Sequence, residues 1–295
     1  MNYAFLTLGT DDLQRALGLW CDHMGLEEVQ EQPRIGDLEH FWALPRGALL
    51  DARMLETVGA PAGRLLLLAF SESAPRVRDH ADPRDLCPKN LDVNVVDLPA
   101  RYRALCDAGL VPRSAPVSYA IDDLQVREVQ FSMPEGVNLV LAEILGEPLC
   151  TTWAGFGAVT STVTTVADLD AEEQFFRTLG FQAVGRHDLA GPEIERMIGL
   201  PPGGGLTISL HGAVAHRFGR AELVRYQPSI GQDLYARTAL PAIGLLRAAI
   251  DVEDLDCCAR QCREAGYRIL KERSFGTRRG RSLQSPAGWW IDLLE

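Results

Sequence analysis

Apolar and polar residues follow one pattern that occurs four times along the chain. Each copy has a short apolar strand, an Asp-Leu pair, a helix with apolar residues at three- and four-residue spacing, and a glycine before a second strand. The Asp-Leu pairs are Asp12-Leu13, Asp97-Leu98, Asp168-Leu169 and Asp254-Leu255, and the glycines are Gly25, Gly109, Gly180 and Gly266. The pattern predicts four copies of one small unit, which we call modules.

The spacing from the Asp-Leu pair to the glycine, which the four modules share, has a physical explanation. An aspartate before a helix accepts hydrogen bonds from the free N–H groups of the first turn. A glycine just past the helix end adopts the left-handed conformation that commonly terminates helices. We therefore expect each Asp-Leu pair to begin a helix, and each glycine to end one.

A longer period lies over the four modules. Asp12 and Asp168 are 156 residues apart, and Asp97 and Asp254 are 157 apart, so the chain divides into two similar halves. The halves join around residues 146–155, and a connector covers residues 228–241. Further short strands are predicted at 126–131, 137–144 and 206–214. Strand, helix and three more strands in each module indicate an α+β protein with mixed sheets.

Composition narrows the function classes. The chain has 295 residues, of which 46% are hydrophobic and 23% charged, with a net charge of −11. This acidity argues against a nucleic-acid partner, which would need clustered Lys and Arg. No apolar run is long enough to span a membrane, and the first residues do not form a signal peptide. Seven scattered cysteines give no disulfide framework. We expect a cytoplasmic monomer or homodimer that binds a small molecule.

The motifs resemble those of the vicinal oxygen chelate superfamily, which includes glyoxalases, bleomycin-resistance proteins and extradiol dioxygenases. The matching segments are Val163–Leu169, Leu179-Gly180-Phe181 and Ser285–Leu293. The resemblance implies βαβββ modules paired so that their sheets curl around a cup. We accordingly expect an α+β fold of two tandem domains, residues 1–147 and 153–295, each built from two consecutive modules.

In that superfamily a cup usually holds one divalent metal, with ligands on the first and last strands of each module. The matching positions here are Phe5, Leu65, Asn90 and Val140 in the expected N-terminal cup, and Ser161, Glu222, Arg247 and Asp292 in the expected C-terminal cup. Phe, Leu and Val cannot bind a metal, and an Arg would repel one. None of the six histidines falls on a ligand position. The expectation is therefore no metal and no other cofactor.

The all-polar C-terminal set suggests an enzyme that kept the cup and lost the metal. Arg247 would stabilise an oxyanion, while Glu222 or Asp292 would act as general acid or base. The further candidates for substrate binding are Ser161, His211, Tyr226, Trp290 and Asn90. Such a site fits a lyase, isomerase or cyclase.

Three alternatives remain open from the sequence. Arg247 and its carboxylates can form an ion network that only stabilises the fold. The protein can bind a drug or other ligand without catalysis, as the bleomycin-resistance branch does. A metal-dependent dioxygenase or glyoxalase is the third alternative, but the sequence lacks the two histidines that such a site would need.

Overall fold

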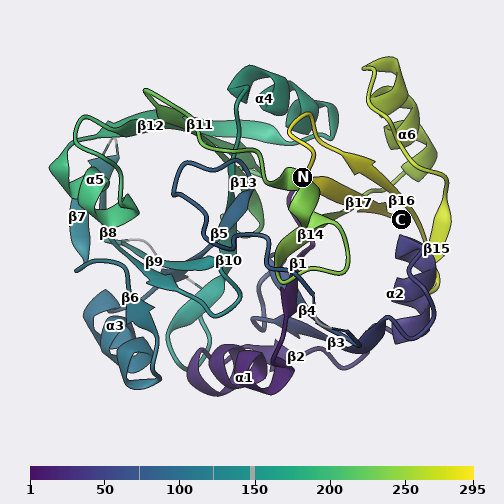
Figure 1. Ribbon diagram of the computed structural model, residues 1–295, viewed down its shortest axis with the longest axis horizontal. Helices are drawn as coiled ribbons and strands as arrows, with labels where there is room; N and C mark the ends of the chain where they lie inside the picture. The colour runs from purple at the N-terminus through teal and green to yellow at the C-terminus, as the bar shows by residue number, and fades with distance from the viewer. Residues whose placement is uncertain (73, 122, 147–149) are drawn as a thin grey trace.

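A computed structural model describes residues 1–72, 74–121, 123–146 and 150–295 and shows two curved sheets side by side (Figure 1). The eight-stranded sheet has the strand order β15-β16-β17-β14-β1-β4-β3-β2. The nine-stranded sheet has the order β11-β12-β13-β10-β5-β9-β8-β6, with β7 paired to β8. The sheets are mixed, and helices accompany each module, so the predicted α+β class is confirmed.

The four modules follow one another along the chain. The first module comprises β1 (Phe5–Thr10), α1 (Leu13–Leu17), the π-helical turn η1 (Gly18–His23), β2 (Glu27–Glu28), α2 (Ile35–Trp42), β3 (Leu49–Glu56) and β4 (Arg64–Phe70). The second comprises β5 (Pro88–Val95), α3 (Leu98–Asp107), β6 (Val111–Pro112), β7 (Val117–Ile121), β8 (Leu124–Ser132) and β9 (Asn138–Ile144). The third comprises β10 (Phe156–Thr165), α4 (Leu169–Thr178), β11 (Gln182–Ala190), α5 (Pro192–Ile198), β12 (Gly205–Gly212) and β13 (Arg220–Gln227). After the 3₁₀ helix η2 (Tyr235–Thr238), the fourth comprises β14 (Gly244–Asp251), α6 (Leu255–Glu264), β15 (Arg273–Phe275), β16 (Arg278–Gln284) and β17 (Trp290–Leu294).

The predicted helix ends are confirmed in all four modules. Each aspartate of an Asp-Leu pair is an N-cap whose side chain accepts from the backbone N–H three residues later. The glycine that follows each helix has a φ between +78° and +90°. This left-handed backbone strains any residue with a side chain, which explains why glycine recurs there.

The pairing of the modules differs from the expectation. The first strands of modules one and four, β1 and β14, pair antiparallel, and so do β5 and β10 of modules two and three. Consecutive modules one and two, or three and four, therefore do not complete a cup. A repeat identifies the modules but not their partners, because every module offers an equivalent first strand for pairing. Residue 147, the expected end of the first domain, lies outside the described residues.

The two sheets share one core on their helix-bearing faces. This core includes Trp20 beside α1, Phe131 of β8, Phe175 of α4 and Trp289 before β17, all buried. The opposite, concave faces have separate apolar clusters, one around Phe5 and one around the α5 helix. The shared core fixes the sheets together and leaves two concave faces for ligands.

Helices α2 and α5 were not predicted, and each one joins two modules. Helix α2 of the first module packs against β15 of the fourth, while α5 of the third packs against β8 of the second. They precede the Leu44-Pro45 and Leu200-Pro201 pairs, which share the 156-residue period. Each helix therefore contributes a wall of a cup. None of the described helices combines the length and apolar character needed to cross a membrane.

Candidate functional site

Each concave face encloses a cavity. The β5–β10 cup, formed by modules two and three, has a cavity of about 620 Å³, and the β1–β14 cup, formed by modules one and four, has one of about 780 Å³. Both volumes are in the range of small-molecule binding sites. The two cups differ in chemistry, because the first contains buried carboxyl groups and the second contains arginine and tryptophan.

The structure divides the predicted site residues between the two cups. Asn90, Ser161, Glu222 and Tyr226 line the β5–β10 cup. Arg247 and Trp290 line the β1–β14 cup, where Arg247 binds Asp292. The predicted catalytic set of Glu222, Arg247 and Asp292 is therefore not brought together. The cause is the module pairing, which places the third and fourth modules in different sheets.

Two further predicted positions lie on the wrong face of their strands. His211 is on the helix-bearing side of β12, where it contacts Ser209 and lies near the ring of Phe176. Leu210, directly before it, and Ile208 face the cup instead, because successive residues of a strand point to opposite faces. Leu65 packs in the shared core, and Leu66 belongs to the cluster around Phe5 on the concave face. A shift of one residue along a strand exchanges the two faces, so the motif-based alignment erred by one position at Leu65.

The β5–β10 cup holds a pair of carboxyl groups joined by one hydroxyl group. Ser161 Oγ lies 2.8 Å from Asp92 Oδ2 and 3.0 Å from Glu222 Oε2. A serine hydroxyl group has one hydrogen, so it can donate to only one of these oxygens. The other contact is a hydrogen bond only if that carboxyl group is protonated and donates to Ser161. The geometry therefore favours one proton held between Asp92 and Glu222.

Burial supports the same protonation state. Asp92 and Glu222 are buried or half-buried in the cup wall, and desolvation by burial raises the pKa of Glu222 from 4.5 to about 7. Burial, followed by the charges of Glu222 and Glu128, raises the pKa of Asp92 well above its ordinary range. Asp92 Oδ1 has no hydrogen-bond partner among the described residues. Two neighbouring carboxyl groups with different pKa values are a common arrangement in acid–base catalysis.

A third carboxyl group lies near this pair. Glu128 of β8 accepts hydrogen bonds from Tyr119 Oη and from Gln130 Nε2, the latter at 3.3 Å. Burial raises the pKa of Glu128, and these two donors partly offset that effect. All three side chains line the cavity. The cup thus combines apolar walls with carboxyl groups whose charged forms are disfavoured.

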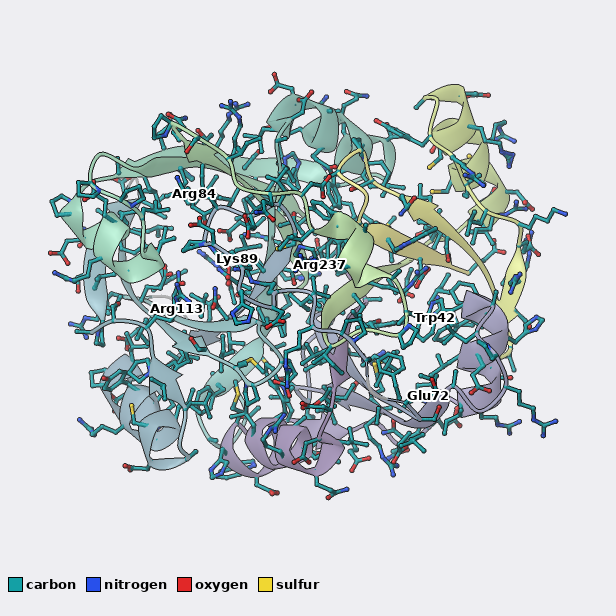
Figure 2. The ribbon with its side chains drawn as sticks, in the orientation of Figure 1. Trp42, Glu72, Arg84, Lys89, Arg113 and Arg237 are labelled. Atoms are coloured by element: carbon teal, nitrogen blue, oxygen red, sulfur yellow. The ribbon has the colours of Figure 1, made fainter. Side chains whose placement is uncertain are left out.

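A buried lysine lies behind Tyr226. Lys89 Nζ donates to the hydroxyl group of Tyr226 and, at 3.1 Å, to the carbonyl oxygen of Pro83. Burial, together with the charges of Arg78 and Arg113, lowers the pKa of Lys89 to about 7. Figure 2 shows Lys89 and Arg113 on the side of the molecule that carries the β5–β10 cup. Tyr226 therefore connects the cavity to a second group that titrates near neutral pH.

The β1–β14 cup is organised around a buried ion pair. Arg247 Nε donates to Asp292 Oδ2 at 2.9 Å, Arg247 Nη2 donates to Ser282 Oγ at 2.9 Å, and Trp42 Nε1 donates to Asp292 Oδ2 at 3.0 Å. The guanidinium carbon lies 5.7 Å from the ring centre of Trp42 and 4.9 Å from that of Trp290. Two indole rings thus lie close to the guanidinium group of Arg247, and Asp292 balances its charge.

The residues at the superfamily's ligand positions do not fit a metal. In the β1–β14 cup these positions hold Phe5, Leu66, Arg247 and Asp292. The guanidinium group of Arg247 is hydrogen-bonded to the carboxylate of Asp292, so this carboxylate is not free to bind a metal. In the β5–β10 cup, Val140 offers no ligand atom, Asn90 Oδ1 accepts a hydrogen bond from Asn138, and Ser161 and Glu222 are hydrogen-bonded to each other. No three His, Cys, Asp or Glu side chains of the described residues form a group that could hold a metal ion.

The raised pKa of Glu222 predicts how stability depends on pH. The folded protein holds this proton up to about pH 7, while the unfolded chain releases it near 4.5, so folding stability should fall as pH rises between these values. At about 1.4 kcal/mol per pKa unit, the effect is about 3 kcal/mol. Urea unfolding from pH 4 to 8 should show E222Q gaining stability relative to the wild type by this amount. Parallel profiles for the two proteins would refute the shift.

Sequence comparison and structure comparison give different results for this chain. No family model and no curated protein matches the sequence. Glyoxalase I from Zea mays is similar in structure, with 13% identity, a TM-score of 0.70, and coverage of 100% of this chain and 92% of that one. A putative dioxygenase from Bacillus subtilis is similar with 11% identity, a TM-score of 0.65, and coverage of 100% and 84%.

These similarities extend over all modules, and at such low identity they concern the fold alone. Both solved structures have names that belong to the branches expected from the repeat motifs. The four-module architecture and the structural similarities agree, and this chain therefore has the vicinal oxygen chelate fold.

Proposed function

We propose that the protein is an enzyme of this fold that moves a proton on a small carbonyl compound in the β5–β10 cup, without a metal. The observation that carries the proposal is the Asp92–Ser161–Glu222 arrangement in the cavity wall. The arrangement supplies a base and a neutral acid that are bridged by the hydroxyl group of Ser161. Reactions that need both are isomerisations and eliminations at a carbon next to a carbonyl group.

Each group has a defined role in the proposed reaction. Glu222, with a pKa of about 7, removes a proton from the carbon next to the carbonyl group. The electron pair of the broken C–H bond forms an enolate, and protonated Asp92 turns the hydrogen bond that it gives to Ser161 in the free protein toward the enolate oxygen. Glu222 then returns the proton to a carbon, which gives an isomer, or the electron pair expels a leaving group, which gives a lyase product. Ser161 positions the two carboxyl groups.

Neighbouring residues support substrate binding in this cup. Asn90 Oδ1 accepts from Asn138 Nδ2 at 2.8 Å, and the Nδ2 group of Asn90 has no partner among the described residues, so it can donate to a substrate oxygen. Val126, Val140 and Val224 form apolar parts of the cavity wall, against which the carbon skeleton of a substrate can pack. A substrate that displaces water from the cavity strengthens the interactions of the carboxyl groups with a developing charge.

Hydrogen–deuterium exchange tests this proposal without knowledge of the product. The protein is incubated in D₂O with a panel of small ketones, aldehydes and 2-oxo acids, and ¹H NMR follows the loss of the C–H signal next to the carbonyl group. We expect protein-dependent exchange for at least one compound, at a rate that EDTA leaves unchanged. Exchange that EDTA abolishes, or no exchange across the panel, would contradict the proposal.

A further inference from the structure

The β1–β14 cup has a second, chemically different cavity that the proposed reaction does not use. It is lined by aromatic side chains from both modules, namely Phe41, Trp42, Phe70 and Trp290. Its charged lining residues among those described are Arg46, Arg247, Lys271, Arg273 and Glu72. Figure 2 shows Trp42 and Glu72 on the side of the molecule opposite Lys89 and Arg113. This cavity is therefore separate from the carboxyl cluster.

The lining charges favour an anion. Four cationic side chains and one carboxylate line the cavity, and buried Asp292 balances Arg247, so an excess of two positive charges remains, whereas the whole chain has a net charge of −11. Arg46 and Lys271 are exposed and form no ion pair with the described residues. A concave surface of one sign concentrates ligands of the opposite sign. This local excess of positive charge stands out because the rest of the protein is acidic.

Arg247 has one hydrogen-bonding edge left for a ligand. Its Nε and Nη2 groups are bound to Asp292 and Ser282, but Nη1 has no hydrogen-bond partner among the described residues. The residue is only 6% exposed and lines the cavity, and Nη1 is not among the fully buried polar atoms of the described residues that lack a partner, so a ligand in the cavity can reach it. The ion pair with Asp292 and the two indole rings fix its direction. An oxygen anion that enters the cavity would meet two preoriented N–H donors.

The aromatic walls specify the remainder of the ligand. Trp42 and Trp290 both lie close to the guanidinium group, and both line the cavity. Flat rings stack on indole faces better than puckered rings of the same size, because aromatic pairs add dispersion and quadrupole terms. We propose that the β1–β14 cup binds a small planar aromatic carboxylate, with its anion on Arg247 Nη1 and its ring against Trp290.

Isothermal titration calorimetry with three probes tests the proposal. Benzoate carries both features, benzamide lacks the charge, and cyclohexanecarboxylate lacks the flat ring. We expect benzoate to bind about tenfold more tightly than either of the other two. Equal affinities for benzoate and benzamide would overturn the role of the charge, and no benzoate binding would overturn the whole proposal.

Two tryptophan variants locate the site. Trp290→Leu should weaken benzoate binding about tenfold, because it removes the stacking wall. Trp153→Leu, at a 78% exposed position outside the cavity lining, is the matched control and should bind as the wild type does. Benzoate binding that Trp290→Leu leaves unchanged would contradict the site. E222Q should also leave it unchanged, so the result is independent of the proposed reaction in the other cup.

Discussion

Substitution of Glu222 by glutamine should lower the rate of C–H exchange in the β5–β10 cup by about 10²- to 10⁴-fold, the range that a positioned general base contributes. Glutamine keeps the size of the side chain and can still contact Ser161, but it cannot accept a proton from carbon. Binding should change less than rate, because apolar walls and Asn90 remain. NMR exchange rates of both proteins, measured at saturating carbonyl compound, give the ratio.

Two comparisons make this result specific. Glu253→Gln is a matched control at an exposed position and should exchange as fast as the wild type does. Asp92→Asn should also slow exchange, because an amide is a weaker hydrogen-bond donor to the enolate oxygen than a carboxylic acid is. Unchanged exchange in E222Q would remove Glu222 from the role of base, and the proposed reaction would be wrong.

Substitution of Arg247 by leucine should destabilise the fold by about 3–5 kcal/mol, the usual cost of removing one partner of a buried ion pair. Asp292 is 1% exposed and would keep only Ser282 and Trp42 as donors. Its charge would then be buried without a cation. Urea unfolding at pH 7 measures the difference.

The double variant Arg247→Leu/Asp292→Leu separates the ion pair from the rest of the packing. Removal of both charges should restore most of the lost stability, since an apolar pair of similar volume is often neutral. A double variant as unstable as the single one would show that the indole contacts of Arg247, rather than the unpaired Asp292, cause the loss.

The repeat determined much of what could be predicted. Asp12 and Gly25, like their counterparts in the other modules, end up as the N-cap and the left-handed residue that their types require. The N-cap and the left-handed glycine depend only on residues close in sequence, so both can be predicted from a single sequence. The fold could be predicted because four such units recur at nearly constant spacing, and the structural similarity to glyoxalase I confirms it.

The site was harder to predict, because it depends on which modules pair. Ser161 and Arg247 stand at equivalent first-strand positions of neighbouring modules, yet the sheet topology places them in different cups. No local signal decides between the two pairings. Trp42 was missed for a related reason, since helix α2 carries it from the first module to an ion pair of the fourth.

Asp92 was a residue that strand periodicity could have identified. It lies two positions after Asn90 on β5, and alternate residues of a strand face the same side. The same rule places Glu128 and Gln130 together on β8. Family motifs drew attention to one position on each strand, whereas the alternation of the strand would have extended the site to its neighbours.

The shared proton between Asp92 and Glu222 is the central claim, and infrared spectroscopy tests it most directly. Protein labelled with ¹³C at aspartate carboxyl groups is measured at pH 7, where ordinary aspartates are ionised. We predict one protonated carboxyl band in the wild type, which Asp92→Asn removes and Ser161→Ala shifts. A spectrum at pH 7 in which every aspartate is ionised would contradict the account.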